Sequence, residues 1–266
     1  MTAYADVTII HNDGNKIQSV SLNLIGEEPL SIRIDGKPYS VVMRTPGDEI
    51  AHAAGFCLTE GIIDTPEDIT ALACCDGSDS NVVTITLTET RRLKIAGYMD
   101  RRSFISQTSC GICGKELIQD ISTTIAPVRD DTRFPISSAL ACLDAFSEHQ
   151  PLRRKTRATH AALIIDADTH VLSAAEDVGR HNAVDKAIGK LFLDRRLSRA
   201  KGLVLSSRIS YELVQKAARA GIPVIVAVSR PTSLAVDLAS RLEMTLACLA
   251  PKNGLYVFSG EQRLIA

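Results

Sequence analysis

The chain has 266 residues, 30 of them basic and 31 acidic, which gives a formal net charge of −1 at pH 7. Its apolar share of 45% and charged share of 23% are ordinary for a globular protein, and its length suits two domains. The balanced charge gives no reason to expect a binder of nucleic acid or of anionic membranes. No apolar run approaches the ~20 residues of a membrane helix. Met1–Asp6 lacks the features of a secretory signal, so we expect a soluble, cytoplasmic protein.

The seven cysteines are an odd number spread through the chain, which is not the pattern of a disulfide framework. In a reducing compartment they are thiols, and any chemistry must come from a particular spacing. We interpret Cys57, Cys142 and Cys248 as small, buried apolar residues. The sequence pattern indicates no role for the adjacent pair Cys74-Cys75.

The first part of the chain, residues 1–108, has the pattern of an α+β subdomain. Ser19–Ile25 and Leu30–Ile34 have strand-like composition, and Asp35-Gly36 after the second of them predicts a hairpin turn. Val83–Leu87 alternates apolar residues with threonine, which predicts a further strand.

A helix is predicted to begin within the run Thr45-Pro46-Gly47-Asp48. Thr45 suits the N-cap, Pro46 suits the first helical position, and Asp48 suits a capping carboxylate. The apolar spacing that follows predicts one buried helix face and an end at Gly61.

The middle of the chain, Arg91–Arg133, is polar and is predicted to be an irregular connection, partly mobile. Its second part, residues 109–134, is predicted to be the linker between the two domains. This linker carries Cys110 and Cys113.

Residues 135–266 alternate apolar strands with amphipathic helices, which is typical of an α/β domain with a largely parallel sheet covered on both faces. Ser137 and Ser138 are expected to cap its first helix. The strands are expected at 161–165, 170–174, 203–206, 223–229, 245–249 and 255–259, and the later helices at 182–193, 211–220 and 234–244.

The sharpest local motif is Ser109–Gly114, which contains two cysteines three positions apart. Such a pair can share a metal, form a disulfide or pass a sulfur atom between its thiols, and this spacing often lowers a thiol pKa. An isolated CxxC is also typical of half a structural zinc site. Closure needs two more ligands, however, and the sequence has no second CxxC. The pair also lacks the βαβ context of a thioredoxin-like motif.

A second motif, Glu176–Lys186, passes from a strand into a helix, where backbone N–H groups favour an anion. Arg180, His181 and Lys186 add positive charge that could meet a phosphate. A purely structural interpretation also fits: Asp177 and Asn182 would cap the helix, Arg180 would pair with the preceding glutamate, and Lys186 would be solvated.

Two shorter stretches also lie beside strand ends. His160 precedes an apolar strand, a place where a histidine is more often structural than a ligand. Ser206–Glu212, with Arg208, follows another strand, and open α/β sheets bind ligands at such places. Helix capping by Ser210 is the structural alternative for this stretch.

Together these stretches resemble the formate dehydrogenase accessory sulfurtransferases, the FdhD family. The unbroken run Glu176–Lys186 is the most specific part of the resemblance, and Arg157-Ala158 departs from it by lacking a glycine that many members carry. The other similar stretches are Arg44–Glu49, Gly55–Gly61, Ser109–Gly114, Thr159–Ala162, Ser206–Arg208, Tyr211-Glu212, Val214–Lys216 and Leu234-Ala235.

The resemblance implies a cysteine persulfide chemistry. Members take sulfur from a cysteine desulfurase and pass it to the molybdenum bis(molybdopterin guanine dinucleotide) cofactor of formate dehydrogenase. Cys110 matches the cysteine that carries the persulfide, and Cys113 matches its partner. The resemblance further implies a homodimer and a C-terminal cytidine-deaminase-like, three-layer α/β/α domain. It assigns a cofactor contact to the loop Leu249, Ala250, Pro251, Lys252, Asn253 and Gly254.

The comparison with deaminases can be checked on the residues. Zinc deaminases need an HxE motif together with PCxxC. His52, His160 and His181 are each followed two positions on by alanine, and Ser109 precedes Cys110 where the motif needs proline. The sequence therefore excludes base deamination and predicts no resident metal.

Our hypothesis from the sequence is a sulfurtransferase that serves formate dehydrogenase. Cys110 and Cys113 would carry the sulfur, and His160, Arg180, His181, Arg208 and the loop 249–254 would bind the guanine-nucleotide ends of the cofactor. Two alternatives remain open: a molybdenum-cofactor chaperone without catalysis, and a zinc-stabilised adaptor protein.

Overall fold

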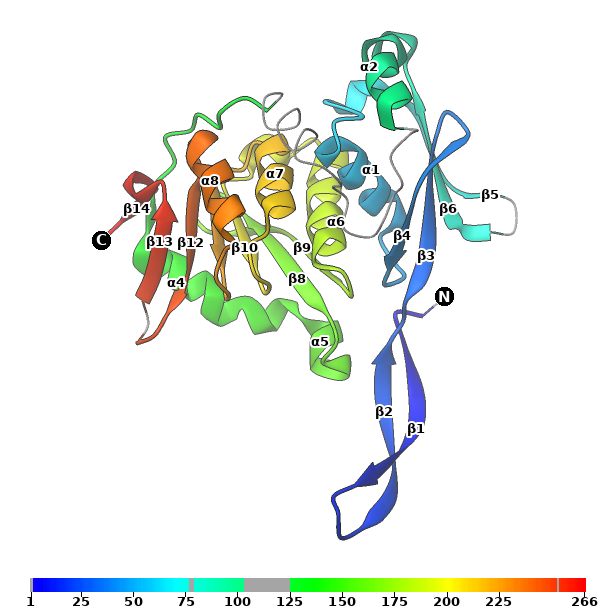
Figure 1. Ribbon diagram of the computed structural model, residues 1–266, viewed down its shortest axis with the longest axis vertical. Helices are drawn as coiled ribbons and strands as arrows, with labels where there is room; N and C mark the ends of the chain where they lie inside the picture. Colours follow the sequence, from blue (N-terminus) through cyan, green and yellow to red (C-terminus); the bar gives the residue numbers. More distant parts are fainter. Residues whose placement is uncertain (1, 77–78, 103–124, 253) are drawn as a thin grey trace.

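A six-stranded mixed sheet forms the centre of the larger part of the molecule (Figure 1). The computed structural model describes residues 2–76, 79–102, 125–252 and 254–266. In the sheet order β13-β12-β11-β10-β8-β9, the strands β10, β11 and β12 are parallel, and β8 and β13 are antiparallel to their neighbours. The bounds are β8 (His160–Ile165), β9 (Val171–Asp177), β10 (Gly202–Leu205), β11 (Val224–Ala227), β12 (Thr245–Ala250) and β13 (Gly254–Ser259).

The prediction of a largely parallel sheet is right for the three central strands and wrong for the edges. β8 is joined to β9, and β12 to β13, by a few residues each. Such a short connection can only return the chain antiparallel to itself, whereas parallel neighbours need a crossover, which α7 and α8 supply.

Helices cover both faces of this sheet, which gives three layers. One face packs against α6, α7 and α8 in a core with alternate strand residues such as Ile164, Leu205 and Ile225. The other face packs residues such as Leu163 and Val204 against the first helix after the linker. The helices are α4 (Ile136–Asp144), α5 (Pro151–Thr156), α6 (Arg180–Leu193), α7 (Tyr211–Arg219) and α8 (Ser233–Arg241).

A second, four-stranded sheet, in the order β4-β3-β6-β5, belongs to the N-terminal part. The predicted hairpin between β3 and β4 is confirmed, with Asp35 and Gly36 at φ values of 49° and 77°, as a tight two-residue turn requires. The bounds are β3 (Glu28–Ile34), β4 (Lys37–Arg44), α1 (Glu49–Thr59), β5 (Ile69–Asp76), β6 (Asp79–Leu87) and α2 (Glu89–Arg102).

The N-terminal helix α1 packs directly on α6, so the two parts share one hydrophobic core. The backbones meet at two glycines. A Cβ atom at Gly55 would lie 1.9 Å from the carbonyl oxygen of Asp185, and one at Gly189 would lie 1.8 Å from that of Ala51. Only glycine permits this approach. The division into domains at residues 109 and 134 stays a prediction.

The first two strands, β1 (Tyr4–Asn12) and β2 (Ile17–Ile25), form a separate antiparallel hairpin that projects from the body (Figure 1). We call this hairpin the arm. Only its second strand was expected from the sequence. The chain ends with β14 (Leu264–Ile265), which pairs in parallel with β7 (Phe134–Pro135).

Three local predictions were wrong. The helix expected near Pro46 begins at Glu49 and has Asp48, in a left-handed conformation, as its N-cap. The irregular connection expected from Arg91 includes the helix α2. The helix α4 begins after Pro135 without a serine cap. Among the described residues, no helix is both long and apolar enough to cross a membrane.

Candidate functional site

Three helices begin along one edge of the six-stranded sheet. β9 leads into α6, β10 into α7 and β11 into α8, and these strands all run in the same direction. We call this the carboxyl edge, formed by His160 and the segments 177–181, 206–210, 228–232 and 249–254. Helix N-termini direct free N–H groups and partial positive charge outward, so the edge favours an anion.

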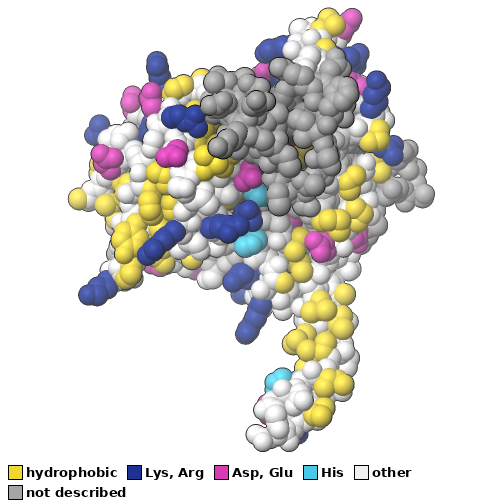
Figure 2. Space-filling view, in the orientation of Figure 1, with side chains coloured by type: hydrophobic (Ala, Val, Ile, Leu, Met, Phe, Trp, Pro, Cys, Tyr) yellow, Lys and Arg dark blue, Asp and Glu magenta, His cyan; other side chains and the backbone are white. Residues whose placement is uncertain are grey.

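The nucleotide-binding residues predicted from the sequence lie along this edge. His160 starts β8 beside the end of β9, Arg180 and His181 open α6, and Arg208 is exposed after β10. Lys and Arg side chains gather with histidine on this part of the surface, where the three helices begin in Figure 1 (Figure 2).

The loop 249–254 lies at the same edge but farther along it. The loop lies at the end of β12, and the strands β11 and β10 lie between β12 and β8 in the sheet. At a strand spacing of about 4.8 Å, the loop is roughly 15 Å from His160. A single small group cannot contact both places, whereas an extended ligand can. Asn253 is outside the described residues.

His181 is held by two oxygen atoms from the start of α7. Its Nε2 lies 3.3 Å from Ser210 Oγ and 3.5 Å from Glu212 Oε2. The hydrogen bond from His181, assisted by one from Ser210, lowers the pKa of Glu212 to about 2. Because Glu212 is therefore ionised at neutral pH, we infer that Nε2 of His181 carries a proton. Its Nδ1 has no partner among the described residues.

His160 has a different environment. Burial lowers its pKa, and the positive charges of Arg180 and Arg153 lower it further. It is therefore neutral at physiological pH and can both donate and accept a hydrogen bond. The Nε atom of Arg180 is buried without a partner among the described residues.

The N-terminal part also builds the carboxyl edge, through Thr45. Its N–H donates to Asp177 Oδ2 at 3.0 Å, and its hydroxyl accepts from the N–H of Val178 at 3.1 Å. Lys186 Nζ lies 2.7 Å from the same Asp177 oxygen and donates to the Thr45 carbonyl at 2.7 Å. The sequence interpretation of Thr45 as a helix cap missed this role, because the partners are more than 130 residues away.

Both interpretations of Glu176–Lys186 need correction. Lys186 is buried in an ion pair, so it is neither solvated nor available to a phosphate. Glu176 does not pair with Arg180; it accepts N–H bonds from the first turn of α5 and a bond from the Thr159 hydroxyl. The expected capping of α6 by Asp177 and Asn182 is wrong, because Gly179 is the N-cap and no side chain among the described residues caps this helix. Asp177 Oδ1 instead accepts from the N–H of Gly179, just before the helix, and from Asn182 Nδ2.

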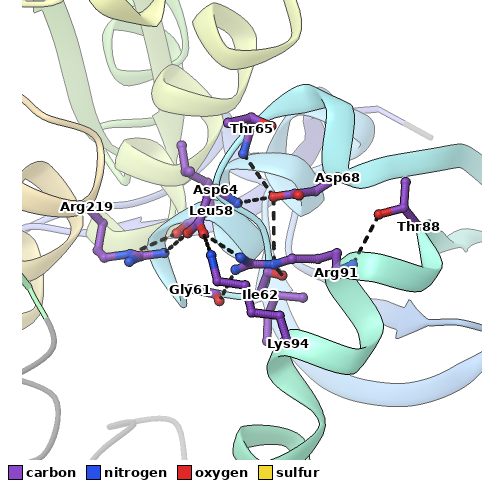
Figure 3. Close-up of polar contacts among 10 residues, drawn as sticks. All are labelled: Leu58, Gly61, Ile62, Asp64, Thr65, Asp68, Thr88, Arg91, Lys94 and Arg219. Atoms are coloured by element: carbon purple, nitrogen blue, oxygen red, sulfur yellow. Dashed lines mark hydrogen bonds and ion pairs between the residues drawn. The ribbon is translucent and has the colours of Figure 1, made fainter.

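Cys110 and Cys113 are outside the described residues, but the elements on either side are well anchored. Before them, Arg91 of α2 donates to the carbonyl oxygens of Ile62 at 2.7 Å and Gly61 at 2.8 Å, and it pairs with Asp64 (Figure 3). Asp64 also binds Arg219 of α7 at 2.9 Å. These contacts tie α2 to both parts of the molecule. After them, the N–H of Val128 donates to the Leu242 carbonyl at 2.8 Å.

Three of the thiols among the described residues do not have the environment of a reactive cysteine. Burial raises the pKa of Cys57, Cys142 and Cys248, which disfavours the thiolate. Cys57 and Cys248 are buried as predicted, whereas Cys142 is half-buried. Cys74 lies in β5.

Within the part of the chain that the structure describes, one group of side chains has metal-ligand spacing: Asp166, Asp168 and His170, whose ligand atoms lie within 4.8 Å of one another. Asp166 Oδ1 already accepts the N–H groups of Asp168 and His170, and Oδ2 lies 3.3 Å from Arg199. The group therefore has a structural explanation as the turn between β8 and β9.

The fold defines a three-layer α/β protein in which three helices begin along one edge of the central sheet. Residues 25–265 match the model of the FdhD/NarQ family, and the chain belongs to this family. It is 37% identical over 249 residues to the sulfur carrier protein FdhD of Streptomyces coelicolor, covering 91% of this chain and 88% of that one. It is 35% identical over 274 residues to the protein of the same name from Mycobacterium tuberculosis, covering 98% and 99%.

The fold has a counterpart of known structure. A crystal structure described as a formate dehydrogenase accessory protein from Desulfotalea psychrophila superposes with a TM-score of 0.79. It covers 99% of this chain and 100% of that chain at 23% identity. At this identity the likeness supports the fold alone.

Proposed function

We propose that this protein is a cytoplasmic sulfurtransferase that carries sulfur as a Cys110 persulfide from a cysteine desulfurase to the molybdenum bis(molybdopterin guanine dinucleotide) cofactor of formate dehydrogenase. The observation that carries the proposal is family membership over residues 25–265, combined with the cysteine pair in the sequence. Relatives that share more than a third of their residues with this chain are named sulfur carrier proteins.

The first step is a thiol exchange that needs no external oxidant or reductant. The Cys110 thiolate attacks the outer sulfur of the donor's persulfide, a new S–S bond forms at Cys110, and the donor leaves as a thiolate. In the second step, Cys113 attacks Cys110 Sγ and releases the carried sulfur as sulfide to the molybdenum centre. The resulting Cys110–Cys113 disulfide is then reduced by a cellular dithiol.

The carboxyl edge is proposed to hold the nucleotide ends of this cofactor. Arg180, Arg208 and the helix N-termini offer charge and N–H donors to phosphate. His160 and His181 offer hydrogen bonds, and the loop 249–254 lies far enough along the edge to contact a second part of an extended ligand.

The sulfur-transfer step is tested by intact mass after incubation with a cysteine desulfurase and cysteine. We expect an adduct of one sulfur atom on the wild-type protein and on Cys113→Ala, and none on Cys110→Ala. Cys248→Ala is the matched control, since that thiol is buried. An adduct that survives Cys110→Ala would refute the assigned carrier. Stoichiometric zinc lost only from the Cys110 or Cys113 variants would favour the adaptor alternative.

The nucleotide site is tested by calorimetry with GDP. Arg208→Ala should weaken binding about tenfold or more, since hydrogen bonds to charged groups contribute about 1.5–3 kcal/mol. Arg195→Ala is the control, because Arg195 is also exposed but follows the opposite end of α6. An equal loss of GDP affinity in both variants would mean that GDP binding depends only on the net charge of the protein. Normal GDP binding and client activation with both cysteines replaced by alanine would favour the chaperone alternative.

A further inference from the structure

The short helix α5 directs one arginine toward the carboxyl edge. Nη1 of Arg153 donates to the carbonyl oxygen of Thr159 at 2.9 Å, and Thr159 directly precedes His160, the first residue of β8. Arg157, at the end of α5, adopts a φ of 57°, and this left-handed turn leads the chain from α5 into β8. The guanidinium of Arg153 is therefore held next to a residue of the edge by a contact outside its own helix.

The charge of Arg153 is not balanced by an ion pair within the part of the chain that the structure describes. Glu176, on the adjacent strand β9, is already engaged by other donors. One of its oxygens accepts the N–H of Leu152 at 2.7 Å, and the other accepts the N–H of Arg153 at 2.8 Å and the hydroxyl of Thr159 at 2.7 Å. The Arg153 side chain is exposed, so the N–H groups that do not bind the Thr159 carbonyl can bind a further acceptor.

Arg180 belongs to the same place, on the neighbouring strand end. His160 pairs with Asp177 across β8 and β9, and Arg180 begins α6 shortly after Asp177. Its Nε is buried without a partner among the described residues. Burial lowers the pKa of His160, and the positive charges of Arg180 and Arg153 lower it further. Both guanidinium groups therefore act on one histidine, although they come from different helices.

The first turn of α6 adds further donors at this place. None of the described side chains caps this helix, so its first N–H groups and the positive end of its dipole are directed outward at the carboxyl edge. The carboxylate that precedes the helix, Asp177, is buried, and Lys186 neutralises it at 2.7 Å. The remaining charge is positive and comes from two arginines and one helix terminus. A ligand with more than one negative charge fits it.

We propose that Arg153 and Arg180 together bind a diphosphate group at the start of α6. A guanidinium group binds two oxygen atoms of one phosphate side by side, so two guanidinium groups on separate elements match two adjacent phosphates. The neutral His160 beside them can donate a hydrogen bond to a phosphate oxygen. This inference rests on the proposed function, because it assigns the diphosphate of one guanine-nucleotide end of the cofactor to α5 and α6. The loop 249–254 is left to another part of the ligand.

The test is calorimetry with GDP, GMP and inorganic pyrophosphate on variants of two neighbouring arginines. Arg153→Ala removes the proposed contact. Arg154→Ala is the matched control, because Arg154 is also exposed but donates to the carbonyl oxygens of Ser147 at 2.8 Å and Glu148 at 3.2 Å, in the segment between α4 and α5. Each variant loses one positive charge and its bonding to backbone carbonyls, so the two differ in where the charge is removed.

Arg153→Ala should weaken the binding of GDP and of pyrophosphate about tenfold or more, as expected for the loss of hydrogen bonds to a charged group. GMP should lose less, because a single phosphate can contact only one of the two arginines. The preference of the wild type for GDP over GMP should therefore shrink. Arg154→Ala should change all three affinities by less than about twofold, because an exposed charge away from the ligand is screened by salt.

A second variant separates binding from a structural role of Arg153. Arg153→Gln keeps a donor for the Thr159 carbonyl without the charge, so it should lose pyrophosphate affinity as Arg153→Ala does. Full affinity in Arg153→Gln, an equal loss in Arg153→Ala and Arg154→Ala, or a wild-type protein that binds none of the three probes would overturn the proposal.

Pyrophosphate also distinguishes this inference from the proposed function. Pyrophosphate binding that depends on Arg153, in a protein with no preference for a guanine nucleotide, would support the diphosphate site and contradict the nucleotide part of the proposed function. GDP binding that does not depend on Arg153 would do the reverse.

Discussion

The buried histidine of α1 should make the stability of the fold depend on pH in a defined window. His52 is fully buried, and neither ring nitrogen has a hydrogen-bond partner among the described residues. Burial lowers its pKa well below 6.5, and the charges of Lys186, Lys216 and Arg44 lower it further. It is therefore neutral in the folded protein and takes up a proton only on unfolding.

The sign and size of the effect follow from proton linkage. Below pH 6.5 the unfolded chain binds a proton at His52 that the folded chain does not, so the free energy of unfolding decreases as the pH falls. From pH 7 to pH 5.5 the loss from this one group is about 1.2 kcal/mol. Glu212, whose pKa is lowered from 4.5 to about 2, changes the free energy of unfolding only at more acidic pH. Its stabilising contribution is lost as the pH falls from 4.5 to about 2. His160 contributes in the same window as His52 and with the same sign.

The perturbation is His52→Leu, which removes the titrating group and the two unpaired nitrogens together. Urea unfolding followed by circular dichroism at pH 7 and pH 5.5 gives the free energy of unfolding at each pH. The difference between the two values should be smaller in His52→Leu than in the wild type by about 1.2 kcal/mol. The core variant Val184→Ala is the control and should lose the same amount at both pH values. An unchanged pH difference in His52→Leu would show that this histidine is not held neutral.

Three further variants test the packing that joins the two parts, each by urea unfolding at pH 7. Gly189→Ala should lower the free energy of unfolding by about 3 kcal/mol or more, because its Cβ would overlap the backbone of α1. Gly97→Ala, with open space around its Cβ, should raise it by about 0.5–1 kcal/mol. Equal effects of the two variants would contradict the close approach of α1 and α6. Lys186→Met should cost about 3–5 kcal/mol by leaving a buried carboxylate without its cation, and a neutral result would mean that the ion pair is not buried in solution. Asp64→Asn should cost only about 1–2 kcal/mol because that carboxylate is partly exposed, so a loss as large as that of Lys186→Met would be unexpected.

The C-terminal elements were predictable because each apolar run of the sequence forms one buried strand or one buried helix face. β10 and β11 are short runs with every residue buried, and α7 has a strongly one-sided apolar pattern. The alternation of strands and helices along the chain indicates a sheet with parallel strands. In such a sheet the helices that follow the strands begin at one edge. The positions along that edge therefore follow from sequence, although their roles toward a ligand remain predictions.

The parts that sequence did not predict depend on distant partners or on exposed surface. β1 of the arm pairs only with β2 and has no buried residue, so it lacks the signal of a core strand. Thr45 has the local sequence pattern of a helix cap, but its N–H donates a hydrogen bond to Asp177 instead. Arg157 adopts a φ of 57° at the end of α5, a conformation that glycine adopts without strain.

Buried polar contacts join the N-terminal part of the molecule to the C-terminal part. Lys216 lies 2.8 Å from Asp185, and both lie beside Thr59 of α1, while Lys186 joins Thr45 to Asp177. Burying such charges costs several kcal/mol per ion unless every partner is in place, and here the partners come from both halves. The start of α6, which carries Arg180 and His181, is thus positioned by the N-terminal part as much as by the sheet. A change in that part, even far from the carboxyl edge, should alter how the edge presents its charges.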